Sequence, residues 1–210
     1  MKTDQADKNE SRWIIVRIDG KIASVSTDYR QLASITARLA GTTGADAKAY
    51  KELSASTETI CADTVSFNEI WKLKKTVRWE DFILLGTDFQ KSVWKKLWEL
   101  THPTDPAAEK RLLSYTDFAE LCDNRAGVRA VAHAIGLNPL PALIPCHLVV
   151  PKETVDRILD IQKKAESTIF KGDDLCLGSI LQDRATNFGE YALGKALKRK
   201  FINLEFNISE

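Results

Sequence analysis

The stretch SYTDFAELCDNRAGVRAVAHAIGL, residues Ser114–Leu137, predicts two short helices joined by a few residues. The first helix is expected to be capped at Ser114 or Thr116, because hydroxyl side chains accept hydrogen bonds from the free amides of a first helical turn. The second is expected to end near Gly136, since glycine suits the end of a helix. Together they make a helix-turn-helix pattern. The pattern alone is weak evidence of function, because many α-helical hairpins share it.

An amphipathic helix is predicted just before this pair, in residues 86–100 (GTDFQKSVWKKLWEL). It is expected to begin at Thr87 or Asp88, either of which can cap it. Apolar side chains recur along one stripe of this helix, at Phe89, Val93, Leu97 and Leu100. Trp94 and Trp98 are four residues apart and are expected to lie in the core rather than to form a ligand platform.

The N-terminal part predicts a small α+β domain over residues 1–84. Residues 12–28 (RWIIVRIDGKIASVSTD) indicate two strands around an Asp-Gly turn, which is a strong hairpin signal. Residues 29–41 have the spacing of a helix that stops at Gly41, and a strand is expected at residues 81–85. The remainder, residues 85–210, is expected to form a helical C-terminal domain with a winged helix-turn-helix-like motif. The fold class is therefore α+β.

Composition excludes several classes of protein. Charged residues make up 28% and hydrophobic residues 44%, as in folded soluble proteins, and a net charge of +1 does not indicate a strongly basic nucleic-acid binder. No apolar run approaches the roughly 18 residues of a membrane helix, and the polar N-terminus does not resemble a signal peptide. The cysteines have no CxxC spacing, which argues against a zinc finger or a disulfide framework and suits a reducing cytoplasm. They are Cys61, Cys122, Cys146 and Cys176.

One cysteine stands out, in the run NPLPALIPCHLVVPKE of residues 138–153. Most free cysteines are buried structural thiols, and that interpretation remains open for Cys146. Two neighbours favour a nucleophile, because Pro145 fixes the backbone before the thiol and His147 is one of only three histidines. Adjacent side chains of an extended segment point to opposite faces. A bridging water or a local turn would therefore be needed to couple the thiol to the imidazole.

Four motifs now identify a resemblance. The runs GTDFQKSVW, SYTDFAEL, RAVAHAIGLNPLPALIPCHLVV and GEYALGKALKRKFINLE occur in that order between Gly86 and Glu205. Together they resemble the O6-alkylguanine-DNA alkyltransferases, which repair DNA by taking an alkyl group onto a cysteine. The resemblance is specific over this range and loose in the N-terminal part.

The resemblance implies a role for each matching residue. It makes Cys146 the alkyl acceptor, His147 its water-bridged base and Glu205 the third member of a triad. The implied DNA and substrate contacts come from Tyr115, Arg129, Asn138, Val149 and Tyr191. Arg129 would fill the gap left by a flipped nucleotide, and Tyr115 would help to rotate that nucleotide and give a proton to the guanine ring. Asn138 would form the hinge between the helix-turn-helix and the active-site turn, while Tyr191 and Val149 would line the base pocket.

The chain also departs from the family pattern. Leu148 stands where an arginine usually follows Cys-His, and His133 replaces a small residue on the expected DNA-facing helix. An insertion of about residues 151–186 replaces a short pocket loop. It predicts an amphipathic helix that is either a lid on the pocket or an external ornament. The apolar residues of this helix are Val155, Ile158, Leu159 and Ile169.

The resemblance implies a cytoplasmic, single-turnover methyltransferase that works without a cofactor or metal. Its partner would be double-stranded DNA that carries O6-alkylguanine, bound through the minor groove by a monomer with the damaged base flipped out. Whether O4-alkylthymine is a substrate stays open. Two alternatives are a lesion-binding protein that does not transfer the group and a helix-turn-helix regulator that reads a defined sequence.

Overall fold

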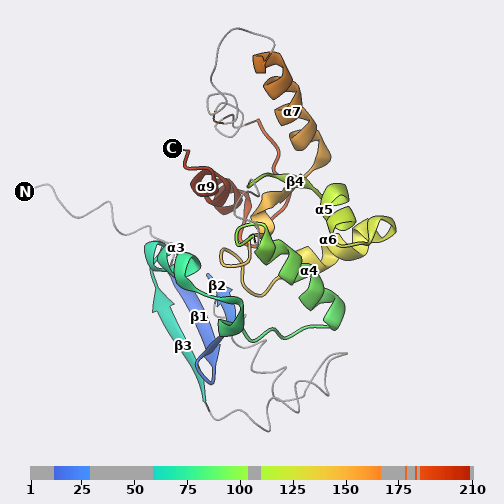
Figure 1. Cartoon of the computed structure of the whole chain (residues 1–210). Helices are drawn as coiled ribbons and strands as arrows, with labels where there is room; N and C mark the ends of the chain where they lie inside the picture. Colours follow the sequence, from blue (N-terminus) through green and yellow to red (C-terminus); the bar gives the residue numbers. More distant parts are fainter. Residues whose placement is uncertain are drawn as a thin grey trace, which may run out of the picture. The chain divides into compact units, whose positions relative to one another are not determined.

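The computed structural model describes residues 12–28, 59–103, 110–166, 178, 183 and 185–208. The chain divides into two units, which Figure 1 shows with their elements labelled. The first consists of Met1–Lys91 and Pro139–Ile144, and the second of Ser92–Asn138 and Pro145–Glu210. Pro139–Ile144 thus groups with the first unit, although it follows the helix-turn-helix in sequence. The proposed boundary after residue 84 stays a prediction.

The first unit contains a three-stranded antiparallel sheet. Its strands are β1 (Trp13–Ile18), β2 (Lys21–Ser26) and β3 (Ile60–Val65), in the order β2-β1-β3. The predicted hairpin is confirmed, and its turn residues Asp19 and Gly20 have φ angles of 47° and 79°. Both angles lie in the left-handed region, which an Asp-Gly pair tolerates well. Most side chains of β1 and β2 are buried.

The third strand is not where the sequence predicted it. Residues 81–85 contribute only an isolated bridge between Phe82 and Ile22, whereas the strand itself is β3, which is exposed along most of its length. The helix α3 (Phe67–Thr76) follows β3 and has a capping box formed by Ser66 and Glu69. The helix predicted for residues 29–41 lies outside the described residues.

The second unit contains the helix-turn-helix. Its helices are α5 (Tyr115–Leu121) and α6 (Val128–Gly136), separated by the 3-10 helix η3 (Arg125–Gly127). Ser114 caps α5 by accepting a hydrogen bond from the Asp117 amide, which confirms one of the two predicted caps. Figure 1 shows α5 and α6 side by side.

The helix α4 (Asp88–Glu99) packs on this pair. Thr87 caps it by accepting from the Gln90 amide, and Trp94 and Trp98 are buried as predicted. The indole Nε1 of Trp94 donates to the Ala134 carbonyl of α6 over 2.8 Å. This bond satisfies a buried donor and fixes α4 against α6. Phe89, predicted to lie on the buried stripe, is instead 39% exposed.

The rest of the second unit surrounds a small parallel ladder of β4 (Leu113–Ser114) and β5 (Val149–Val150). The helix α7 (Lys152–Glu166) starts beside β4, and α9 (Lys195–Glu205) closes the domain. One apolar cluster joins these elements and contains Leu112, Leu148, Val150, Ile158, Phe188 and Ile202. Of the predicted stripe of α7, Ile158 belongs to this cluster and Val155 packs against it. Leu159 is exposed, and Ile169 lies outside the described residues.

Candidate active site

A tight turn presents the cysteine. Cys146–Leu148 forms the 3-10 helix η4, with Pro145 as its N-cap at φ −81°, and leads directly into β5. Of the two ways predicted to couple the thiol to the imidazole, a bridging water or a local turn, the structure shows a local turn. Proline fixes φ near the value seen and so favours entry into this turn. Because the backbone turns, Cys146 and His147 are not held on opposite faces as they would be in a strand. Cys146 is 6% exposed and His147 is fully buried.

The histidine is held by a carboxylate from the last helix. The Nε2 atom of His147 lies 3.1 Å from Oε1 of Glu205, at the end of α9, and both side chains are buried. An ionised carboxylate can only accept, so this contact places a hydrogen on Nε2 and leaves Nδ1 as the acceptor of a neutral imidazole. The ring of Phe201 stacks on the imidazole with centroids 5.2 Å apart, which restricts its rotation.

The surroundings of the thiol pull its pKa in opposite directions. Burial raises the pKa of Cys146, and this is the largest effect. It is opposed by the Nδ2 group of Asn138, which donates to Sγ over 3.1 Å, by the positive charge of Lys198 and by the side chain of Tyr191. Burial thus favours the uncharged thiol of Cys146, whereas the polar and charged groups around it favour the thiolate.

Lys198 is a site residue that sequence reasoning missed. Its side chain is 1% exposed, and its Nζ atom donates to the Val149 carbonyl over 2.8 Å. Burial lowers the pKa of Lys198 to about 8, while the charges of Cys146 and Glu190 act the other way. The available signal was helical spacing, because Lys198 lies two turns before Glu205 and so shares its face of α9.

The remaining predicted site residues fall into two groups. Asn138 and Tyr191 act on Cys146 through the contacts above, and the Val149 amide donates to the Cys146 carbonyl. Tyr115 is close enough for the charge of Cys146 to act on it. Burial, with smaller effects from the charges of Cys146 and Glu190, raises the pKa of Tyr115, so this hydroxyl keeps its proton over a wider pH range. By contrast, Arg129 and His133 lie on the exposed side of α6. No contact of Arg129 with the Cys146 group is seen among the described residues.

Two further properties bear on cofactors and membranes. Across the described ranges, no group of three or more His, Cys, Asp or Glu side chains could hold a metal ion. Each helix in those ranges is too short or too polar to cross a membrane.

Comparison with known proteins adds to this geometry. A model of the family "6-O-methylguanine DNA methyltransferase, DNA binding domain" matches residues 88–157. A probable methylated-DNA–protein-cysteine methyltransferase of Acanthamoeba polyphaga mimivirus is 44% identical over 72 residues, which cover 34% of this chain and 44% of that protein. The inducible methylated-DNA–protein-cysteine methyltransferase of Bacillus subtilis strain 168 is 37% identical over 93 residues, which cover 39% and 48%. The matched stretches thus span less than half of each relative.

A solved structure supports the fold. The crystal structure of O6-methylguanine-DNA methyltransferase from the archaeon Pyrococcus kodakaraensis KOD1 aligns with a TM-score of 0.50 and 17% identity, over 94% of this chain and 93% of that one. The α+β fold class predicted from the sequence is confirmed. Residues 88–157, which include the helix-turn-helix and the Cys146 turn, match the DNA-binding domain of the 6-O-methylguanine DNA methyltransferases. The chain is therefore similar to the O6-alkylguanine-DNA alkyltransferases over about a third of its length in sequence, and over most of its length in fold.

Proposed function

We propose that this protein repairs DNA by moving an alkyl group from O6-alkylguanine irreversibly onto Cys146. The observation that carries the proposal is the linked set of Cys146, His147 and Glu205, with Nε2 of His147 3.1 Å from the carboxylate. A buried carboxylate behind an imidazole, next to a thiol, is the arrangement that activates a cysteine nucleophile. The relatives named above are methyltransferases, which supports the same reaction class.

The chemistry proceeds in one displacement. His147 accepts the thiol proton through Nδ1 or a bridging water, and Glu205 stabilises the resulting imidazolium. The thiolate attacks the alkyl carbon, so that an S–C bond forms while the C–O6 bond breaks and its electron pair stays on the guanine. Tyr115, whose raised pKa keeps its hydroxyl protonated before the reaction, gives a proton to the guanine ring as this charge develops and regains one from solvent afterwards. The thioether has no easy leaving path, so each molecule reacts once.

DNA would reach the site through the helix-turn-helix. A guanine inside a duplex hides O6 from a protein thiol, so the damaged nucleotide must flip out. Arg129 is exposed on α6, where a guanidinium can enter the vacated space, and Asn138 at the end of α6 connects this helix to the thiol. Small residues of η3 and α6, such as Ala126 and Ala130, allow close approach to a minor groove. We expect a monomer that acts in the cytoplasm.

One experiment tests the proposal directly. The protein is incubated with a duplex that contains a single O6-methylguanine, and its intact mass and peptides are then measured. We expect one added methyl group on the peptide that contains Cys146, and none for Cys146→Ala, which should still bind the duplex. Methylation of Cys61 or Cys122, both outside the site, would refute the assignment of Cys146. Tight binding of the damaged duplex without any transfer would favour a lesion-binding protein.

A further inference from the structure

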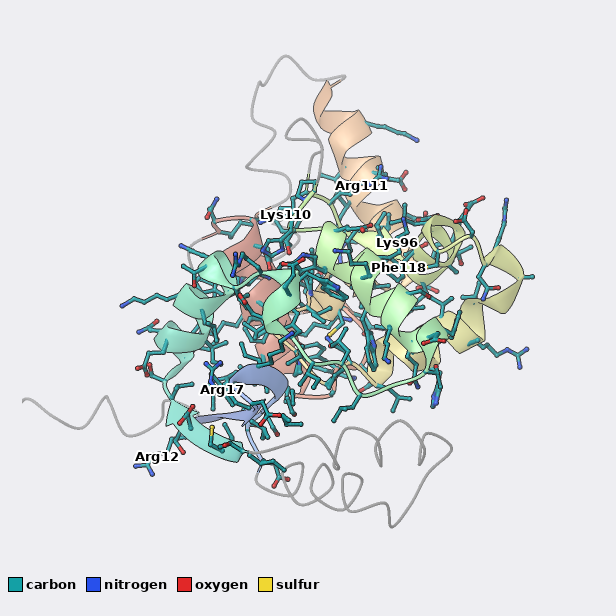
Figure 2. The ribbon with its side chains drawn as sticks, turned by 60° about the horizontal axis from the view of Figure 1, so that its bottom comes forward. Arg12, Arg17, Lys96, Lys110, Arg111 and Phe118 are labelled. Carbon is teal, nitrogen blue, oxygen red and sulfur yellow. The ribbon has the colours of Figure 1, made fainter. Side chains whose placement is uncertain are left out.

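A lysine from a distant part of the chain contacts the far side of the carboxylate that holds His147. The Nζ atom of Lys110 lies 2.8 Å from Oε2 of Glu205 and donates to the main-chain oxygen of Glu205 over 3.1 Å. Lys110 lies shortly before β4, and it is 95 residues from Glu205 in the sequence. Figure 2 labels Lys110 next to Arg111. The two oxygens of Glu205 are therefore divided between two partners, His147 on one side and Lys110 on the other.

This contact differs from an ordinary surface ion pair. The side chain of Glu205 is only 2% exposed, and an isolated buried carboxylate is costly unless it is paired and hydrogen-bonded. Lys110 supplies both, because its second bond goes to a carbonyl at the C-terminal end of α9, where a cation is favoured by the helix dipole. The lysine side chain is 36% exposed and borders a cavity of about 730 Å³, so water reaches the ammonium group.

The pairing decides which group carries the charge that balances Glu205. With Lys110 in place, a cation already faces the carboxylate, so that His147 can remain neutral and can accept a proton at Nδ1. Without Lys110, the imidazole 3.1 Å from the carboxylate would balance more of the buried charge, so its affinity for a proton would rise. A protonated imidazole cannot take the proton of the thiol.

Among the described residues, the contacts seen for the other charged and titratable groups near the imidazole are with other parts of the site. Cys146 and Tyr191 come from the turn and the loop that pack on His147, and Lys198 donates to the Val149 carbonyl rather than to Glu205. Tyr115 and Glu190 interact with the Cys146 and Lys198 side of the site.

We propose that Lys110 is a positioning residue for the alkyl transfer, which holds Glu205 ionised with Oε1 turned to His147 and so keeps the imidazole neutral at neutral pH. The role deepens the proposed function, because it concerns the same Cys146–His147–Glu205 site. Lys110 touches neither the thiol nor the substrate pocket through any contact seen here, and it acts only through Glu205.

The test follows the protonation of His147 directly. The full chain has three histidines, at positions 102, 133 and 147, so nitrogen NMR of the imidazole rings gives a small set of signals, and the loss of one signal in His147→Gln assigns it. In Lys110→Met we expect the pH midpoint of His147 to rise by about one unit, the lower end of the effect of a charge a few ångströms away. Lys110→Gln, which keeps a donor but no charge, should shift in the same direction, whereas Lys110→Arg should stay close to the unsubstituted protein.

The controls separate this role from simple loss of stability. Lys152→Met removes an exposed lysine that pairs with Asp156, and it should leave the His147 midpoint unchanged. Adding Lys110→Met to Glu205→Gln should produce no further shift, because the two residues would act through one another. A midpoint that stays the same or falls in both Lys110→Met and Lys110→Gln would overturn the proposal, and Lys110→Gln alone decides if Lys110→Met does not fold. The titration needs no DNA, so absence of alkyl transfer would refute the proposed function without affecting this result.

Discussion

Lys198→Met should make the protein more stable and its chemistry slower at the same time. Lys198 is buried beside the thiol, and methionine has a similar length without the charge. Its pKa falls from 10.5 to about 8 on folding, which means that the folded state disfavours the charged form. Each pKa unit corresponds to about 1.4 kcal/mol, so burial of this charge costs roughly 3 kcal/mol wherever both states would be protonated.

The sign follows from the direction of that shift. Below pH 8 the lysine is charged in both the folded and the unfolded protein, and the full cost is present. The cost declines as the pH rises from about 8 toward 10.5, because the folded protein then releases a proton that the unfolded chain keeps. Methionine removes this cost but loses the hydrogen bond to the Val149 carbonyl, worth about 1 kcal/mol. We therefore expect a net gain of about 2 kcal/mol at pH 7, or a rise in Tm of about 5 °C for a chain of this size.

Lys198→Met should slow methyl transfer although it stabilises the fold. The positive charge of Lys198 lowers the pKa of Cys146, so its removal lets burial raise that pKa further. A nearby charge changes a pKa by about one unit or more, which lowers the thiolate fraction at pH 7 about tenfold. Single-turnover methyl transfer should slow by at least that factor, and the rate should recover at higher pH.

Two measurements decide the matter. Thermal unfolding is followed at pH 7 and pH 9.5, and transfer rates are measured over the same range, with Lys152→Met as the exposed control. A fall in Tm at pH 7 would refute the predicted cost of burying the Lys198 charge, since Lys198 would then be a stabilising residue. An unchanged methyl-transfer rate in Lys198→Met would show that the lysine charge does not act on the Cys146 thiol.

Three other substitutions test separate parts of the molecule. Glu205→Gln should slow methyl transfer at pH 7 at least tenfold and make the rate rise steeply with pH, because His147 loses the charge that stabilises its imidazolium; a rate equal to that of the unsubstituted protein would exclude the triad. Arg129→Ala should slow repair of duplex DNA far more than reaction with a free O6-alkylguanine base, which needs no flipping, and equal losses would assign Arg129 to the fold or pocket instead. Trp94→Phe should lower the free energy of unfolding by about 1–3 kcal/mol in chemical denaturation, because the Ala134 carbonyl loses its buried donor; an unchanged midpoint would show that this bond contributes nothing.

The sequence predicted best those features that depend on local geometry. The turn at Asp19 and Gly20, the Ser114 cap and the buried Trp94 all follow from rules that act within a few residues. The strand β3 escaped prediction because its side chains are mostly exposed and lack a buried alternating pattern, so that only its pairing with β1 defines it.

In the candidate site, too, local features could be predicted and features set by the tertiary fold could not. Cys146 and His147 are adjacent in the sequence, and the contact of His147 with Glu205 was predicted from the family resemblance. The sequence offers helical spacing from Glu205 as a signal for Lys198 and no comparable signal for Lys110, and a lysine next to other basic residues usually indicates a solvated surface. Only the tertiary fold buries Lys198 and brings Lys110 to the end of α9.

The helix α7 bears on the insertion predicted for about residues 151–186. Its first turns share side-chain packing with the common scaffold, since Ile158 contacts the cluster that includes Leu148 and Ile202. The returning segment is attached as well, because Arg199 of α9 donates to the carbonyls of Asp183 and Thr186. We expect that deletion of the whole segment would remove part of this apolar packing and destabilise the domain. A shortened version of this protein would have to keep residues 151–161 and 183–188 and join them through new chain.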